Sequence, residues 1–152
     1  MQRLVERLRP ADVDRLLAPG PLRPTLTRLA EAMLAAALTP EAIALYRMIL
    51  AEAQRFPEVA AMANRIGARQ EAVDAITTVL RAGRTGGAET ARVRFAAEQF
   101  LQMVIALPQR RALGLGPPLS AEQLRAWARD TVELFLDGYG TDRAPISAAK
   151  RR

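Results

Sequence analysis

Two stretches of this sequence combine an explicit helix start signal with an apolar stripe of helical period. The first is Thr39–Pro57, TPEAIALYRMILAEAQRFP, and the second is Ser120–Gly140, SAEQLRAWARDTVELFLDGYG. Threonine, proline and glutamate at the first start supply a cap, a preset φ and a charge that favours the helix dipole. The second start is a capping-box pattern. Both segments are therefore predicted to be amphipathic helices.

The remaining chain offers no competing strand pattern. Apolar residues recur every three or four positions over about 22–38, 57–82 and 89–107, with a kink expected at Gly67. Composition agrees, because Ala, Leu, Arg and Glu outnumber Val, Ile and Thr, and aromatic residues make up only 5%. A chain of 152 residues is long enough to bury one core. The sequence predicts a single all-α domain of about six helices.

Several kinds of chemistry are excluded by residue types that the chain lacks. It contains no cysteine and no histidine, which removes disulfides, thiolate nucleophiles, imidazole bases and the usual zinc sites. Asp130, Glu133 and Asp137 share one helical face and are interpreted as a solvated acidic surface rather than an acid/base pair or magnesium site. The segment 83–87 is glycine-rich but has no phosphate-loop lysine. We expect no enzyme activity, no cofactor and no metal.

The charge of the chain invites a nucleic-acid interpretation, which its distribution does not favour. The net charge is +6, but the arginines are spread over all segments and usually stand beside an acid, as in Arg55 with Glu52. Solvated helix faces are the preferred interpretation, with weak nonspecific binding of nucleic acid as an alternative. No apolar run reaches the length of a membrane span, and the first residues lack a signal-peptide pattern. We therefore expect a cytoplasmic protein without a membrane partner.

The order and spacing of these segments carry a family resemblance. The phrases LYRMILAEAQRFPE and, at Phe95–Leu101, FAAEQFL, followed by the last helix, resemble the C-terminal regulatory domain of TetR/AcrR-type bacterial transcriptional regulators over about residues 22–140. The resemblance implies an effector pocket between the central helices. It also implies that the last two long helices, about 89–107 and 120–139, pair with those of a second subunit as a four-helix seam.

Family members begin with a helix-turn-helix domain of roughly 50 residues, and residues 1–17 are too short to contain one. We expect residues 1–140 to be one regulatory domain, 1–17 a remnant of the connecting helix, and 141–152 a disordered basic tail. The resemblance implies an effector-binding, homodimerising domain that reads no DNA sequence on its own. The alternative is a standalone helical module that pairs with, or sequesters, a full-length regulator.

The resemblance also places two sets of site residues. The expected pocket for a small hydrophobic effector is lined by Met33, Ala37, Tyr46, Ile49, Leu50, Met62, Ala63, Asn64, Phe100 and Met103. The expected dimer interface contains Leu101, Val104, Ile105, Trp127, Thr131, Leu134 and Phe135. Methionines and alanines leave adaptable space, and two polar side chains can orient a ligand. The opposing interpretation is that the same side chains close into a solid core, and that Trp127 is a packing anchor.

Overall fold

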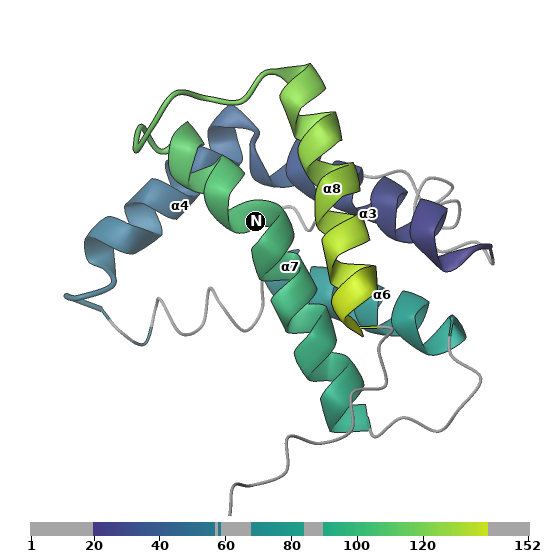
Figure 1. Ribbon diagram of the computed structural model, residues 1–152. Helices are drawn as coiled ribbons and strands as arrows, with labels where there is room; N and C mark the ends of the chain where they lie inside the picture. Colours follow the sequence, from purple (N-terminus) through teal and green to yellow (C-terminus); the bar gives the residue numbers. More distant parts are fainter. Residues whose placement is uncertain (1–19, 57, 59–67, 84–89, 140–152) are drawn as a thin grey trace, which may run out of the picture.

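The computed structural model describes residues 20–56, 58, 68–83 and 90–139. These residues form helices and connections, with no strand among them, so the predicted all-α class is confirmed. The helices are α3 (Leu22–Ala37), α4 (Pro40–Glu52), α6 (Ala68–Ala82), α7 (Thr90–Ala112) and α8 (Ala121–Tyr139) (Figure 1). The expected connecting helix at 1–17, the kink at Gly67 and the basic tail at 141–152 lie outside the described residues.

Both sequence start signals form the hydrogen bonds that their patterns predict. The Ala42 amide donates to the Thr39 hydroxyl at 3.2 Å, and Pro40 occupies the first turn of α4. At α8 the Gln123 amide donates to the Ser120 hydroxyl at 3.2 Å, while the Ser120 amide donates to the Gln123 side chain at 2.9 Å. This reciprocal pair is a complete capping box. Local sequence therefore fixes where α4 and α8 begin.

The core is built around α7, which contacts α3, α6 and α8. In Figure 1, α8 lies beside α7, and α3 and α6 lie behind the pair. The side chains with at most 1% of their surface exposed come from four helices: Leu26, Ala30, Ile76, Leu80, Val93, Ala97, Phe100, Val104, Ala128 and Val132. Contacts on three sides explain why α7 is apolar over most of its circumference near Phe100–Leu107.

The predicted end of α7 is wrong. The sequence suggests a helix that stops at Leu107 before a proline-led connection, but α7 continues through Pro108 to Ala112. A proline inside a helix leaves the carbonyl four residues earlier without its backbone donor. That carbonyl belongs to Val104, and it accepts a hydrogen bond of 2.8 Å from the indole Nε1 of Trp127 on α8. A side chain from a neighbouring helix thus compensates for the proline.

Helix α4 stands apart from this core. It follows α3 after a bend of 70°, its main contact is with α3, and Figure 1 shows it projecting away from the other helices. Ile43 is its one buried residue. Leu45, Met48 and Leu50 on the helix, and Phe56 just beyond it, are exposed. Among the described elements, α4 contributes least to the core.

Candidate functional site

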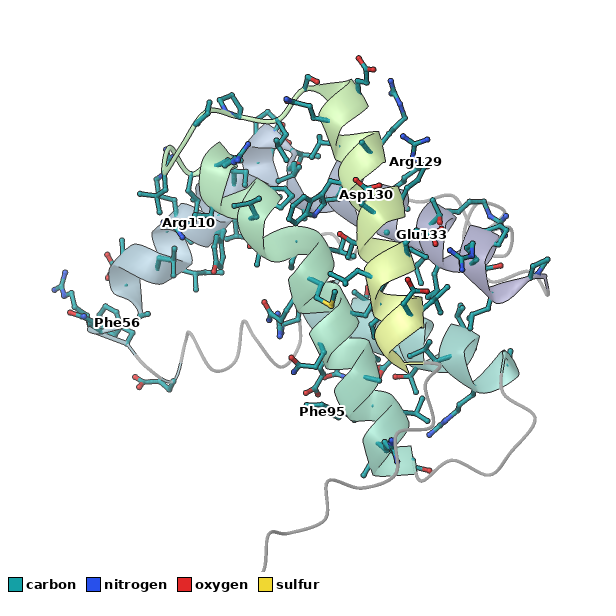
Figure 2. All side chains as sticks on the ribbon, in the orientation of Figure 1. Phe56, Phe95, Arg110, Arg129, Asp130 and Glu133 are labelled. Atoms are coloured by element: carbon teal, nitrogen blue, oxygen red, sulfur yellow. The ribbon has the colours of Figure 1, made fainter. Side chains whose placement is uncertain are left out.

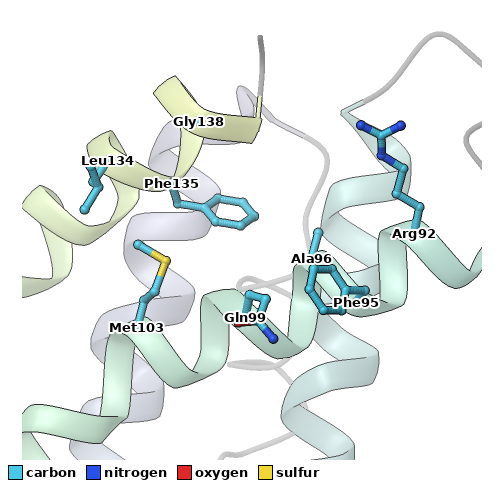
Figure 3. Close-up of a pocket in the computed structure, with 8 residues that line it drawn as sticks. All are labelled: Arg92, Phe95, Ala96, Gln99, Met103, Leu134, Phe135 and Gly138. Atoms are coloured by element: carbon cyan, nitrogen blue, oxygen red, sulfur yellow. The ribbon is translucent and has the colours of Figure 1, made fainter. Parts of the chain in front are cut away.

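A groove of about 340 Å³ lies between α7 and α8 on the outer side of the molecule (Figure 3). Its lining is mostly apolar and comes from these two helices only: Arg92, Phe95, Ala96, Gln99, Met103, Leu134, Phe135 and Gly138. The α7 residues recur at spacings of three and four, which places them on one helical face. The groove is therefore a continuous strip along two neighbouring helices.

Two side chains at the groove are exposed to an unusual extent for their size. Phe95 is 62% exposed and Leu134 is 67% exposed. Their immediate neighbours behave differently, because Ala96 and Phe135 are buried, and the Phe135 ring lies 4.9 Å from the ring of Phe100. The two helices thus fill the core with one stripe and still present a second apolar stripe to the outside.

The ends and floor of the groove add two further features. Gln99 and Arg92 are its polar lining residues, and Figure 3 shows Arg92 at one end. Gly138 faces open space, since a Cβ atom built there would meet nothing within 4 Å. A side chain at position 138 would therefore narrow the groove without a clash in this chain.

The predicted dimer residues divide between the core and this groove. Leu101, Val104 and Thr131 are buried within the single chain. Ile105 and Trp127 are half-buried. Leu134 and Phe135 line the groove. Only part of the predicted set is therefore open to a partner, and Leu134 is its most exposed member.

The predicted pocket residues are spread over three regions. Met33 and Phe100 belong to the core, and Met103 lines the groove between α7 and α8. Ala37 is half-buried at the end of α3, Tyr46 and Ile49 are half-buried on α4, and Leu50 is exposed. Met62, Ala63 and Asn64 lie outside the described residues. The structure brings Met103 together with Leu134 and Phe135, which sequence reasoning assigned to a different site.

Sequence reasoning missed five residues of the groove: Arg92, Phe95, Ala96, Gln99 and Gly138. A signal for three of them exists in the sequence, since positions 92, 95, 99 and 103 form a helical stripe beside the core stripe of Val93, Ala97 and Phe100. Gly138 also lies on a helical stripe, four positions after Leu134 and three after Phe135. A glycine near a helix end is usually part of its termination, and only the structure shows that this one borders a groove.

Ion pairs lie on the exposed surfaces of the helices. Arg23 on α3 pairs with Glu133 on α8, and both side chains are about half exposed. Figure 2 shows Arg129, Asp130 and Glu133 along one side of α8. Arg94 on α7 lies 3.3 Å from Asp74 and 3.6 Å from Glu98. Exposed pairs of this kind contribute little to stability, and Asp130, Glu133 and Asp137 on α8 are all exposed.

Comparison with known families identifies the chain. The model for the AefR-like transcriptional repressor C-terminal domain matches residues 24–141. The chain belongs to this family. No curated protein and no solved structure matches it. The matched range includes all the described helices apart from the first two residues of α3, and the AefR-like assignment agrees with the TetR-type resemblance of the sequence.

The family that matches is one of transcriptional repressors. Within the described part of the chain, no single helix is both long and apolar enough to cross a membrane. The outer face of α7 and α8 is a concave, mostly apolar surface.

Proposed function

We propose that this chain is the effector-binding and dimerisation domain of a TetR-like transcriptional regulator, and that two copies associate through the groove face of α7 and α8. The observation that carries the proposal is the second apolar stripe on these helices. Phe95 and Leu134 remain exposed although the core stripe beside them is already filled. Exposed apolar surface that folding leaves uncovered is typical of an interface.

A two-fold pair through this face is self-complementary, because each copy offers the same groove and the same exposed side chains. Two long helices from each copy give a four-helix seam, and α7 and α8 span 23 and 19 residues. At 1.5 Å per residue the longer helix extends roughly 35 Å. A seam of that length is compatible with burying more than about 1,000 Å² in total, which a specific interface needs.

The test is the oligomeric state of the Leu134→Arg variant. Leu134 is exposed in the single chain, so an arginine there leaves the core intact. In a dimer the new charge would be buried without a partner, which costs several kcal/mol. Light scattering at micromolar concentration is expected to give a dimer for the wild type and a monomer with unchanged helical content for the variant.

The matched control is Leu115→Arg. Leu115 has the same side chain and nearly the same exposure, 66% against 67%, but it lies in the connection between α7 and α8 and does not line the groove. It should remain dimeric. A wild type that stays monomeric at these concentrations would contradict the homodimer and would favour the alternative, in which the same face pairs with a different regulator chain.

We place the effector on the side of the chain formed by α3 and α4. Ala37, Tyr46 and Ile49 are half-buried there, and Leu50 extends the apolar surface to the outside. These side chains, with Met62, Ala63 and Asn64 of the following segment, are proposed to contact a small hydrophobic molecule. The support is the apolar character of α4 together with its limited contact with the core. Tyr46 supplies a polar group that orients a ligand.

We do not propose that this chain reads a DNA sequence on its own. On α7, Arg94 pairs with the acidic side chains of Asp74 and Glu98. The net charge of +6 allows a weak and salt-sensitive association with any duplex. A regulatory role is therefore proposed to act through dimerisation and effector binding.

A further inference from the structure

A hydrogen bond joins α7 to α8 beside the apolar contacts of the two helices. An α-helix normally satisfies the carbonyl of residue 104 with the amide of residue 108. Residue 108 is a buried proline, so this donor does not exist. An unpaired buried carbonyl would cost free energy, and the proline ring also pushes that carbonyl away from the helix axis.

The indole of Trp127 supplies the missing donor. Its Nε1 lies 2.8 Å from the Val104 oxygen, although the two residues are 23 positions apart in sequence. Trp127 is half-buried and packs against the core cluster. A tryptophan has a single donor in a fixed direction, so this bond constrains both the rotation and the translation of α8 relative to α7.

The bond lies at one end of the groove. Val104 follows the groove residue Met103, and Trp127 precedes Leu134 by about two helical turns. The tilted pair of Phe100 and Phe135, with ring centroids 4.9 Å apart, belongs to the same helix contact. Apolar contacts are non-directional and tolerate small shifts. The indole bond is directional and therefore favours a single register of the two helices.

We propose that Trp127 is a positioning residue for the α7–α8 face, which fixes the relative placement of the two helices and thereby the shape of the groove. Its importance for dimerisation rests on the function proposed above, whereas its effect on helix placement does not. Pro108 leaves the Val104 carbonyl free, and the Trp127 indole donates to it. The proline is therefore part of the arrangement that positions α8 against α7.

The experiment uses three variants: Trp127→Phe, Pro108→Ala and the double variant. Trp127→Phe removes the donor and keeps an aromatic ring, which should lower Tm by roughly 4–10 °C. Pro108→Ala returns a backbone amide to the Val104 carbonyl, which has two lone pairs and can accept both donors. The double variant should therefore regain most of the lost Tm, although it no longer has a bond between the helices.

The placement of the helices is measured directly with spin labels. The chain contains no cysteine, so Arg110→Cys on α7 and Asp137→Cys on α8 provide two unique labelling sites, both exposed. Labelled protein is diluted with unlabelled protein, so that only distances within one chain are observed. We expect a narrow distance distribution in the wild type and in Pro108→Ala. We expect a shifted or broadened distribution in Trp127→Phe and in the double variant.

The double variant distinguishes two roles of Trp127: fixing the placement of α8 against α7, and supplying a hydrogen-bond donor to the Val104 carbonyl. Recovery of Tm without recovery of the narrow distribution supports the proposal. Recovery of both, or a distribution that Trp127→Phe leaves unchanged, overturns it. In the dimer, the dissociation constant should rise at least about tenfold in Trp127→Phe and remain raised in the double variant. A monomeric wild type would contradict the proposed dimer, while the spin-label distances would still decide the role of Trp127.

Discussion

Helices α8 and α4 both begin with a satisfied side-chain cap and both expose large apolar residues, but they do so for different reasons. On α8, Ala128, Val132 and Phe135 are buried in the core, and Leu134 is exposed in addition to that filled stripe. On α4, only Ile43 is buried. On α8, the exposed apolar surface is additional to the stripe that packs in the core. On α4, the exposed apolar surface belongs to a helix that contributes little to the described core.

This difference shows that exposure alone does not define an interface. Hydrophobic burial stabilises a helix only where another element covers it. Helix α8 is held in place by α3 and α7, so its outer stripe lies on a rigid support. Helix α4 depends mainly on its local signals and on α3. The two helices should therefore respond differently to equivalent substitutions.

The largest expected effect is in the core that supports α8. Phe100 has no exposed surface and contacts the ring of Phe135. Phe100→Ala should lower the free energy of unfolding by about 3–5 kcal/mol, because it removes a buried ring and leaves a cavity. Denaturant unfolding followed by circular dichroism measures this loss. A loss below about 1 kcal/mol would mean that α7 and α8 are not packed as described.

An intermediate effect is expected from removing the two helix caps. Ser120→Ala on α8 should lower the free energy of unfolding by about 1 kcal/mol, since α8 unfolds together with the core. Thr39→Ala removes the equivalent bond at α4. Because α4 is weakly tied to the core, its loss should appear as faster hydrogen exchange within 40–52, with less than about 0.5 kcal/mol of global change. Equal global losses in the two variants would contradict the distinction between the helices.

The sequence was sufficient for the all-α class and for the starts of α4 and α8, because caps and apolar periodicity act locally. It failed at Pro108, where a distant indole supplies the donor that local reasoning treats as missing. It assigned Leu101 and Val104 to a partner surface because α7 is apolar nearly all round. In the structure, α3, α6 and α8 surround α7 and bury both side chains.

The groove could be predicted only in part. Leu134 and Phe135 were placed on the outer face by their stripe, yet the direction of each side chain depends on how α8 rotates against α7. One residue of difference separates a buried ring from an exposed leucine, since neighbouring helical positions are about 100° apart. Gly138 lies on the same stripe, but the open space beside it is visible only in the structure.

The smallest stability effect is expected on α4, where the experiment tests whether the exposed apolar surface of the helix binds an effector. Leu50 and Met48 are comparably exposed, at 51% and 57%, and lie on nearly opposite sides of the helix. Leu50→Asn and Met48→Asn should each change the free energy of unfolding by less than about 0.5 kcal/mol, because neither side chain is buried. Titration with the fluorescent probe 1-anilinonaphthalene-8-sulfonate should show several-fold weaker binding for Leu50→Asn, whose side chain shares the Tyr46 side of α4. Met48→Asn is the control and should bind like the wild type.

Equal probe binding by all three proteins would remove Leu50 from the effector site and leave its exposure as a consequence of where α4 projects. Weaker binding by Leu50→Asn alone, at unchanged stability, would mean that the exposed apolar surface of α4 serves to bind a ligand and does not stabilise the fold.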